Sequence, residues 1–387
     1  MTQMTATRVP ISTVDDGTRL SDLILELQEK GIAVKGPLER RPGGAGPSDA
    51  GMIWVEGQPV TVPVDAPYVA NTPYSLERED SGHGIYKDGV RLASATPAGR
   101  PKFYDLETAD GTPYWKLALM HLDSLASTVL QTCAYWGNDD QCKFCGIGVS
   151  LASGNTVKVK RPEQLAEVAV AARDLDGAVD ITLTTGSTYG KDRGAFYVSK
   201  CGNAMKEASG LPVEVQFEPP TDLSVIDRVH DLGIDSLGIH VESFDPQVLA
   251  RVAPPKARTG IERYFETWEH AVKLFGEGQV STYVILGMGE DPELTIESCK
   301  RAVDIGVYPF IVPLRPVPGS LMADATPPGH DYTERIARAV APELVRRGLT
   351  ADKVSAGCAR CQACSALGSL EKTIQLGMPQ LPIRSAS

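Results

Sequence analysis

The pattern of apolar and polar residues divides the chain near residue 120. Beyond that point, short apolar runs alternate six times with stretches that carry apolar residues at helical spacing. The six apolar runs predict strands at 125–132, 179–185, 213–217, 235–241, 279–287 and 308–314. Alternation of strands and helices at this length predicts a parallel sheet, so the fold class is α/β. Six units fit an open (β/α)6 partial barrel better than a closed barrel of eight.

The residues before the barrel follow a different pattern. Leu20–Lys30 predicts an amphipathic helix, and two β segments are expected at 52–64 and 84–93, the second with a hairpin turn at Asp88–Gly89. This region resembles a small α+β lid or insertion. After the last strand, the stretch 331–349 predicts one more helix.

Three regions follow from these patterns. We expect an α+β region over 1–115, a partial barrel over 116–325 and a C-terminal extension over 326–387. Because the special residues of the barrel follow its strands, they are expected at the carboxyl ends of the strands, where α/β barrels carry their chemistry.

Composition limits the classes of function. The chain has 387 residues, a formal net charge of −11 and a hydrophobic fraction of 42%. An acidic chain of this kind is not expected to bind nucleic acid, which requires clustered Lys and Arg. No apolar run is long enough to span a membrane, and residues 1–17 lack the pattern of a signal peptide. We therefore expect a cytoplasmic protein with no membrane partner, in which clustered cysteines are metal ligands rather than disulfides.

Six of the eight cysteines form two triplets. The first triplet is Cys133, Cys142 and Cys145, spaced C-x8-C-x2-C at the end of the first barrel strand. Clustered thiolates bind iron–sulfur clusters or soft metals, and three ligands leave one iron of a four-iron cluster open. A structural zinc site is the alternative, but it normally has four protein ligands, and this loop offers no histidine or fourth cysteine.

With Phe144 directly before Cys145, the first triplet resembles that of the radical S-adenosylmethionine (radical SAM) enzymes. The usual spacing in that superfamily has three residues between the first two cysteines, whereas this chain has eight. The resemblance implies that Cys133, Cys142 and Cys145 hold a [4Fe–4S] cluster. Its open iron would bind the amino and carboxylate groups of SAM, and SAM would be cleaved to a 5′-deoxyadenosyl radical.

Residues that follow the later strands extend this resemblance, in particular to the branch of biotin and lipoyl synthases. Gly186 and Ser187 lie where a Gly-Gly-Glu-like motif binds the amino group of SAM, although Ser187 replaces the usual glutamate. Glu242 lies at the ribose position, and Gly287 belongs to an adenine-binding stretch. Two arginines, Arg258 and Arg263, compete for the SAM carboxylate.

The second triplet, Cys358, Cys361 and Cys364, lies in the C-terminal extension with the spacing C-x2-C-x2-C. We interpret it as the site of an auxiliary iron–sulfur cluster, most plainly a second [4Fe–4S] cluster. A zinc knuckle and plain thiols are the alternatives. A fourth ligand from Arg360, Ser365 or Ser385 is open, because related synthases use ligands other than cysteine.

The function expected from these features is a radical SAM enzyme that functionalises a C–H bond of a small molecule. Sulfur insertion from the auxiliary cluster, as a sulfurtransferase, is the leading hypothesis. The alternatives are an auxiliary cluster that binds substrate or relays electrons, and, more distantly, a metal-binding scaffold without catalysis. Sulfur insertion requires the second triplet to fold over the C-terminal mouth of the barrel. An electron donor such as flavodoxin or ferredoxin is the expected partner.

The whole chain also resembles a bacterial radical SAM family that is encoded beside a nitrilase, which implies a small-molecule pathway without giving the substrate. Two acidic residues have two possible interpretations each, and two cysteines outside the triplets have a structural interpretation. Glu218 is either a substrate-facing acid or a carboxylate with its own partners, and Glu290 is equally well explained as an acid at a helix start. Cys201 and Cys299 are expected to be buried structural thiols.

Overall fold

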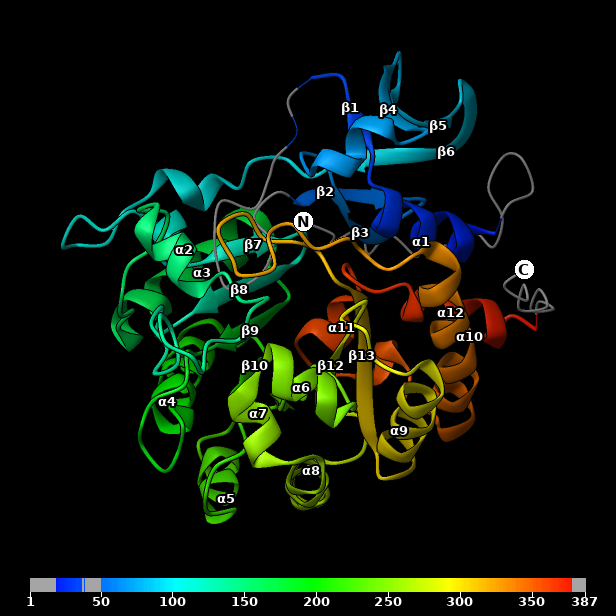
Figure 1. The fold of residues 1–387 in the computed structure, drawn as a ribbon. Helices are drawn as coiled ribbons and strands as arrows, with labels where there is room; N and C mark the ends of the chain where they lie inside the picture. Colours follow the sequence, from blue (N-terminus) through cyan, green and yellow to red (C-terminus); the bar gives the residue numbers. More distant parts are fainter. Residues whose placement is uncertain (1–18, 37, 39–49, 378–387) are drawn as a thin grey trace.

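The computed structural model describes residues 19–36, 38 and 50–377. Within them, the strands form two sheets, one of six strands near the N-terminus and one of seven strands that follows it. Figure 1 shows the second sheet curling round the centre of the molecule, with the first sheet above it.

The seven-stranded sheet is the partial barrel. Its order is β13-β12-β11-β10-β9-β8-β7. The strands are β7 (Leu119–His121), β8 (Ser124–Thr128), β9 (Asp180–Thr184), β10 (Val213–Gln216), β11 (Ser236–Gly238), β12 (Val280–Leu286) and β13 (Val307–Pro313). The pairs from β8 to β13 are all parallel, and β7 adds one antiparallel edge strand. The six expected strands and the α/β partial-barrel fold are therefore confirmed.

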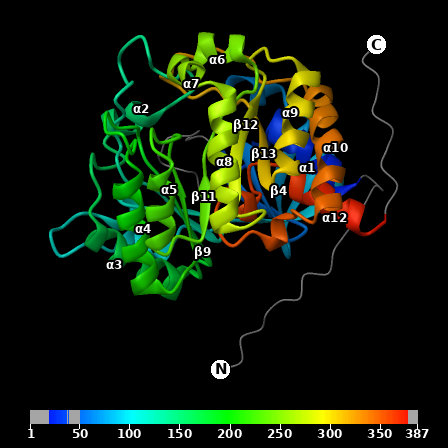
Figure 2. The ribbon, with the colours of Figure 1, turned by 90° about the horizontal axis from the view of Figure 1, so that it is seen from below.

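Helices cover the outer face of this sheet, and Figure 2 shows α3, α4, α5, α8, α9 and α10 in a row around the strands. The helices of the barrel are α2 (Ile147–Ala152), α3 (Pro162–Asp176), α4 (Ala195–Ser209), α5 (Ser224–Asp231), α6 (Pro246–Val252), α7 (Pro254–Thr259), α8 (Ile261–Phe275) and α9 (Pro292–Asp304). In several of them, proline occupies the first turn, where its missing N–H group has no intrahelical partner to lose.

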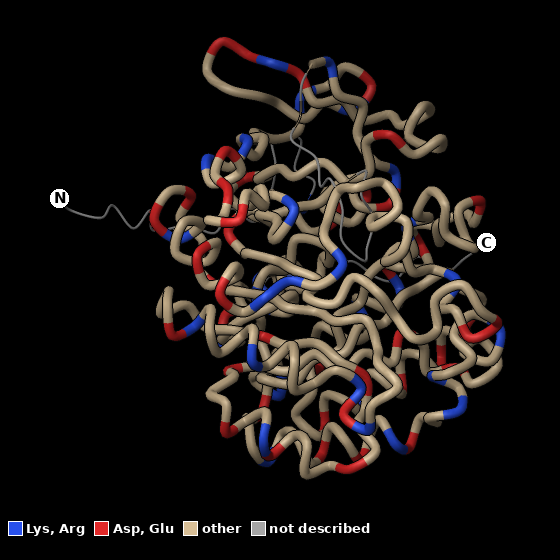
Figure 3. The backbone as a smooth tube through the Cα atoms, turned by 90° about the vertical axis from the view of Figure 1, so that its left-hand side faces the viewer, with Lys and Arg blue, Asp and Glu red and all other residues tan. Residues whose placement is uncertain are grey.

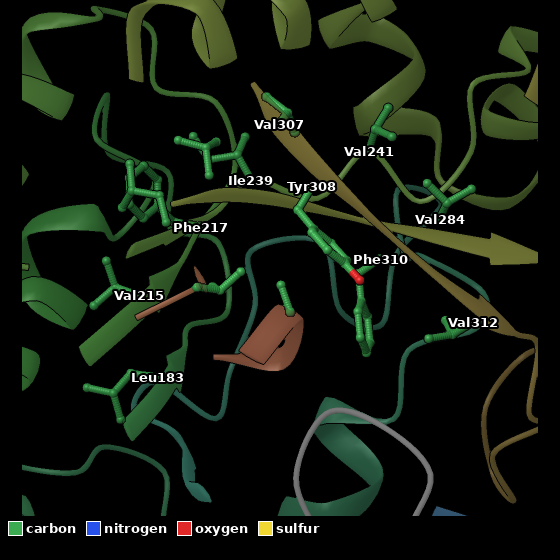
Figure 4. Close-up of a cluster of buried hydrophobic side chains, with 14 of the residues drawn as sticks. Leu183, Val215, Phe217, Ile239, Val241, Val284, Val307, Tyr308, Phe310 and Val312 are labelled. Atoms are coloured by element: carbon green, nitrogen blue, oxygen red, sulfur yellow. The ribbon is translucent and has the colours of Figure 1, made fainter. Parts of the chain in front are cut away.

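Apolar and polar side chains alternate along the strands, and this alternation gives the sheet two different faces. On β9, Ile181 and Leu183 are fully buried in the hydrophobic core, while Thr182 and Thr184 line the interior cavity of the barrel. Side chains on successive strand residues point to opposite faces, so apolar residues pack under the helices and small polar residues face inward. Every residue of β13 is buried, and Figure 4 shows Val307, Tyr308, Phe310 and Val312 along this strand.

The N-terminal sheet has more strands than the sequence indicated. Instead of two β segments it has six strands in the order β1-β4-β5-β6-β2-β3. They are β1 (Ala33–Val34), β2 (Ala50–Val55), β3 (Gln58–Pro63), β4 (Tyr74–Glu79), β5 (Gly82–Lys87) and β6 (Val90–Pro97). The predicted helix α1 (Leu20–Lys30) is confirmed, as is the turn at Asp88–Gly89, where both residues have positive φ.

The N-terminal sheet covers part of the barrel interior. Ala50 and Met52 of β2 and Thr61 of β3 line the same cavity as the barrel strands. The region is therefore one wall of the interior rather than a separate module. Short 3₁₀ helices connect the elements at Pro67–Asn71, Lys102–Asp105, Tyr114–Lys116 and Ala351–Lys353.

The C-terminal extension returns to the barrel. Helices α10 (His330–Arg347) and α12 (Leu367–Gln375) pack beside α9 and α1, and the single turn α11 (Cys358–Cys361) lies between them in the chain. In Figure 1, α11 lies inside the curl of the seven-stranded sheet. The second cysteine triplet therefore lies inside the barrel and not on the surface of the protein.

Two global properties complete the description. Among the described residues, no helix has both the length and the apolar composition required to cross a membrane. Acidic and basic segments are interspersed along the chain on the side drawn in Figure 3.

Candidate functional site

One interior cavity connects the two cysteine triplets. It has a volume of about 360 Å³ and is lined by all six triplet cysteines. The described part of the barrel thus brings together two groups that lie more than 200 positions apart in the sequence. The wall of this cavity comes from β7 to β10, from β12 and β13, from the N-terminal sheet and from the loops that follow the strands.

The first triplet lies in the loop between β8 and α2, at the carboxyl ends of the strands. The amide of Cys145 donates to the carbonyl of Cys142 at 3.1 Å, and the amide of Lys143 donates to the carbonyl of Val252 at 2.8 Å. These bonds fix the C-x2-C turn against Val252, the last residue of α6. Phe144, the aromatic residue of the motif, lines the cavity beside the cysteines.

Gly186 and Ser187 lie against the loop that carries Cys133. A Cβ atom on Gly186 would lie 1.9 Å from the carbonyl oxygen of Thr132, so this close approach requires glycine. The amide of Ala134 donates to the carbonyl of Ser187 at 2.8 Å. Both the amide and the hydroxyl of Ser187 donate toward the sulfur of Cys133. The loop after β9 therefore supports the first cysteine directly.

Glu242 lies at the same end of the cavity and has an unusual backbone. Its φ of 70° is in the left-handed region, which non-glycine residues seldom occupy. Its carboxylate accepts from Lys256 of α7, with Nζ and Oε1 3.3 Å apart, and Lys256 also donates to the carbonyl of His240. Both side chains are nearly buried. This buried ion pair lies at the mouth where SAM is expected.

Lys256, which the sequence analysis did not single out, lines the cavity where an arginine was expected. Arg258 is exposed and pairs with Asp140, and Arg263 donates to the carbonyls of Pro220 and Thr221. Neither arginine lines the cavity, whereas Lys256 does. The structure therefore corrects the expectation that Arg258 or Arg263 contacts the SAM carboxylate.

Gly287 also lies outside the cavity lining. Its amide and that of Met288 donate to the carboxylate of Glu290, each at 2.8 Å. The hydroxyl of Tyr332 donates to the same carboxylate at 2.9 Å. Glu290 therefore organises the turn after β12, which favours the structural interpretation of this residue. Ile285, on the same strand, does line the cavity.

Glu218 faces the cavity and also has a partner. Its Oε2 accepts from the hydroxyl of Tyr135 at 3.2 Å, and both residues line the cavity near Cys133. Burial raises the pKa of Tyr135, and the Glu218 carboxylate raises it further, so this hydroxyl stays protonated. Both sequence interpretations of Glu218 are thus compatible with its position.

The second triplet lies at the opposite end of the same cavity. Gly357 donates its amide to Oδ2 of Asp180 at 2.7 Å, and the amide of Cys358 lies 3.4 Å from Oε2 of Glu214. Asp180 is the first residue of β9, and Glu214 is the second residue of β10. The triplet is therefore at the amino ends of the strands, about 13 Å below the carboxyl ends by the length of β9.

This position corrects the expectation that the second triplet folds over the C-terminal mouth. The second triplet instead lies at the opposite end of the barrel, beside the amino ends of β9 and β10. The space between the two triplets is nevertheless one cavity, so a small molecule inside the barrel would lie between them. The arrangement that the sequence analysis required for sulfur insertion is therefore not found, although both triplets line the same cavity.

A buried ion network holds the second triplet in place. Arg360 donates from Nε and Nη2 to Asp180 at 2.9 and 3.0 Å, and from Nη1 and Nη2 to Asp123 at 3.2 and 2.9 Å. Ser365 donates its hydroxyl to the carbonyl of Ile311 at 2.6 Å. Arg360 and Ser365 are thus committed to other partners and are poor fourth ligands. Ser385, the third candidate, lies outside the described residues.

Burial controls the protonation of the thiols. It raises the pKa of Cys133, Cys142 and Cys358, and it raises that of Cys145 and Cys361 to about 12. Without a metal, such thiols remain protonated and unreactive. A bound metal or cluster displaces these protons, because the thiolate is the ligand. Cys201 and Cys299 are fully buried away from the cavity, which confirms their structural interpretation.

Sequence reasoning missed the polar groups inside the barrel. Besides Lys256, the cavity is lined by His240, Tyr283 and Arg315, and Glu214 lies buried beside the second triplet. Burial raises the pKa of Glu214 to about 7. A signal was present for Glu214, which lies between Val213 and Val215 on β10, as expected for a strand with one polar face.

Comparisons with known proteins match the barrel region of the chain. Residues 137–302 match the family model described as the radical SAM superfamily. The chain is 25% identical over 304 residues to bacteriochlorophyllide c C-7(1)-hydroxylase of Chlorobaculum limnaeum, covering 73% of this chain and 75% of that protein. It is 26% identical over 278 residues to lipoyl synthase of Marinobacter nauticus, covering 65% and 78%.

Solved structures also match. A radical SAM methyltransferase from Sphaerobacter thermophilus aligns at 15% identity with a TM-score of 0.45, covering 76% of this chain and 81% of that one. Methylornithine synthase aligns at 15% identity with a TM-score of 0.42, covering 62% and 72%. The match to the family model shows a radical SAM domain over residues 137–302, a range that includes Cys142 and Cys145 of the first triplet. Such a domain implies a [4Fe–4S] cluster and SAM.

Proposed function

We propose that this chain is an enzyme that uses SAM to functionalise a C–H bond of a small molecule held inside the barrel. The observation that supports this most is that both cysteine triplets line one cavity of about 360 Å³. A cavity of this size, mostly apolar with a few converging polar groups, is typical of a small-molecule site.

The first triplet fits a cluster that leaves one iron open. Three cysteines converge on the mouth, and amide donors from Tyr135, Ser187 and Ile147 approach their sulfurs. Such donors stabilise thiolates. When bound, a [4Fe–4S] cluster at Cys133, Cys142 and Cys145 supplies the electron that cleaves SAM to methionine and a 5′-deoxyadenosyl radical. The walls of the barrel exclude water from that reaction.

We assign the SAM contacts to the residues that line the mouth. Gly186 and Ser187 present their backbone beside Cys133, and Glu242 fits a hydroxyl-binding role toward the ribose. Lys256, held against Glu242, is the cation for the SAM carboxylate in place of Arg258 or Arg263. Gly287 shapes the turn after β12 from outside the cavity.

We further propose that Cys358, Cys361 and Cys364 hold a second iron–sulfur cluster. Three soft thiolates that line one cavity suit such a cluster. Sulfur insertion into the substrate is supported by the access of this triplet to the same cavity as the first. Electron relay and substrate binding at the second cluster are the competing roles, and the reaction depends on an electron donor such as flavodoxin or ferredoxin in the cytoplasm.

The test of the proposal is SAM cleavage by anaerobically reconstituted protein. Dithionite-reduced wild type should form 5′-deoxyadenosine, and Cys142→Ala should form none. The triple variant Cys358→Ala, Cys361→Ala, Cys364→Ala should still form some. Full 5′-deoxyadenosine formation by Cys142→Ala would show that the assignment of the first triplet is wrong.

Iron analysis tests the second cluster separately. With two [4Fe–4S] clusters, the wild type should contain about eight irons per chain, and the triple variant about half. Unchanged iron in the triple variant, or zinc in place of iron, would exclude the second cluster. Metabolite profiling of cells with and without the gene would then identify the substrate, and sulfide-labelled protein would show whether sulfur leaves the second cluster.

A further inference from the structure

Two hydroxyl groups from outside the C-terminal extension lie on the sulfurs of the second triplet. The hydroxyl of Tyr283 donates to Sγ of Cys358 at 3.1 Å. The hydroxyl of Thr61 lies 3.2 Å from Sγ of Cys364. Tyr283 belongs to β12 of the barrel, and Thr61 belongs to β3 of the N-terminal sheet. Three separate regions of the chain therefore meet at this triplet.

Tyr283 is held rigidly in that position. Its ring packs edge-on against His240, with centroids 4.7 Å apart, and against Phe310, with centroids 5.0 Å apart. Its backbone amide donates to Nδ1 of His240 at 3.1 Å. The side chain lines the cavity that both triplets share, and these contacts direct its hydroxyl toward Cys358.

Thr61 is oriented by a second set of contacts. Arg315 donates from Nη1 to the Thr61 hydroxyl at 3.1 Å and from Nη2 to the Thr61 carbonyl at 2.8 Å. The amide of Thr61 donates to the carbonyl of Ala363 at 2.7 Å, next to Cys364 in the chain. Because Arg315 occupies the oxygen of this hydroxyl as a donor, the hydroxyl hydrogen is directed toward Cys364 or the Ala363 carbonyl.

We infer that Tyr283 and Thr61 are positioning residues that set the reduction potential of a cluster held by the second triplet. This inference rests on the proposed function, in which the triplet holds an iron–sulfur cluster. A hydrogen bond to a thiolate withdraws negative charge from the sulfur, and hydrogen bonds to the sulfurs raise the potential of such clusters. The two hydroxyls make the second cluster easier to reduce than its three thiolates alone would.

The N-terminal region therefore does more than cover the barrel. Thr61 of β3 contributes a side chain to the second triplet, and the side-chain amide of Gln28 of α1 donates to the Ala363 carbonyl at 3.1 Å. Tyr283 is expected to have the larger effect, because its hydroxyl donates to a single partner, while that of Thr61 has two acceptors in reach.

The experiment is a potentiometric titration of the full-length reconstituted protein, followed by electron paramagnetic resonance. The paramagnetic resonance signal that is present in the wild type and absent from Cys358→Ala is assigned to the second cluster. Tyr283→Phe should keep the wild-type iron content and shift the midpoint potential to more negative values. A shift of about tenfold in the equilibrium between oxidised and reduced cluster corresponds to 59 mV for one electron.

Tyr308→Phe is the matched control, because Tyr308 is a buried tyrosine on the neighbouring strand whose hydroxyl donates to Glu371 rather than to a sulfur. Its potential should equal that of the wild type. Thr61→Val should shift the midpoint potential in the same direction as Tyr283→Phe, but by a smaller amount. Thr61→Ser keeps the hydroxyl and should have the midpoint potential of the wild type. This pair tests the inference even where Tyr283→Phe fails to fold.

The outcomes separate the inference from the proposed function. If the wild type has no signal that Cys358→Ala removes, the second cluster is wrong and the inference falls with it. If the cluster is present and neither Tyr283→Phe nor Thr61→Val changes its potential, only the inference is overturned. Loss of iron in Tyr283→Phe, with the fold intact, would instead make Tyr283 a ligand and contradict its positioning role.

Discussion

Arg360 and Asp180 form a two-point ion pair across 180 positions of the sequence. Nε of Arg360 lies 2.9 Å from Oδ2 of Asp180, and Nη2 lies 3.0 Å from Oδ1. Asp180 is fully buried at the amino end of β9, and Arg360 directly precedes Cys361 of the second triplet. This pair connects the second triplet to the framework of the sheet.

Removing the arginine should therefore loosen the second triplet. Arg360→Gln leaves the carboxylate of Asp180 buried without its cation, a change that typically costs about 3–5 kcal/mol. The free energy of unfolding, measured with urea, should fall by that order. A chelator should also remove iron faster from the second site than from the first.

Arg301→Gln is the matched control for this prediction. Arg301 pairs with Glu262 at 2.7 Å, but both side chains are exposed, so this variant should change the free energy of unfolding by less than about 1 kcal/mol. Equal losses in the two variants would show that the buried pair has no special role in holding the second triplet.

Lys256→Met should weaken SAM binding. Lys256 is the cation that lines the mouth beside Glu242, and the loss of a hydrogen bond to a charged group costs about 1.5–3 kcal/mol. The dissociation constant of SAM, measured by equilibrium dialysis under anaerobic conditions, should rise at least tenfold. Thermal melting is needed alongside, because this variant also leaves Glu242 without its partner.

Arg258→Gln distinguishes the two candidates for the SAM carboxylate. Arg258 is exposed and pairs with Asp140 on the surface, so its removal should change SAM affinity by no more than about 0.5 kcal/mol. If Arg258→Gln weakens SAM binding and Lys256→Met does not, the sequence-based assignment was right and the placement of Lys256 at the site was misread.

The barrel was predictable because each strand is specified locally. The apolar runs that end at residues 185, 217 and 314 are each followed by a break and a helical period, and the parallel order follows from that alternation. The local pattern of apolar and polar residues was also enough to predict α1 and the turn at Asp88–Gly89. It was not enough for the N-terminal sheet, whose six strands depend on pairing between segments with weak individual signals.

The choice between Lys256 and Arg258 could not be made from the sequence. The two residues lie in the same short helix, and two positions along a helix turn the side chain by about 200°. One therefore points into the cavity, and the other points to Asp140 at the surface. Which residue faces inward depends on the rotation of α7, and that rotation is set by packing against the rest of the barrel.

The depth of the second triplet was unpredictable for a similar reason. Its spacing indicates a shared ligand but carries no information about position. The position is decided by pairing of Arg360 with Asp123 and Asp180, which lie 237 and 180 positions earlier in the chain. Charged residues at strand starts are common on protein surfaces, so neither aspartate stood out before the structure placed the arginine between them.

The buried carboxyl group of Glu371 should make stability depend on pH. Burial raises its pKa from 4.5 to about 7, although the hydroxyl of Tyr308 at 2.6 Å and the amide of Ala351 at 2.9 Å both donate to it. Between pH 4.5 and 7 the folded chain binds this proton more tightly than the unfolded chain does. The free energy of unfolding should therefore fall as the pH rises through that window, by on the order of 3 kcal/mol from this group.

Glu371→Gln removes this titration and should flatten the fall. Burial also raises the pKa of Glu29 and Glu214 to about 7, so the slope should decrease without vanishing. Urea unfolding at pH 5 and pH 8 measures the difference. Glu262→Gln, at an exposed carboxylate paired with Arg301, is the control and should leave the slope close to that of the wild type. A Glu371→Gln variant that loses as much stability between pH 5 and pH 8 as the wild type would mean that this carboxyl group is already ionised in the folded protein at pH 5.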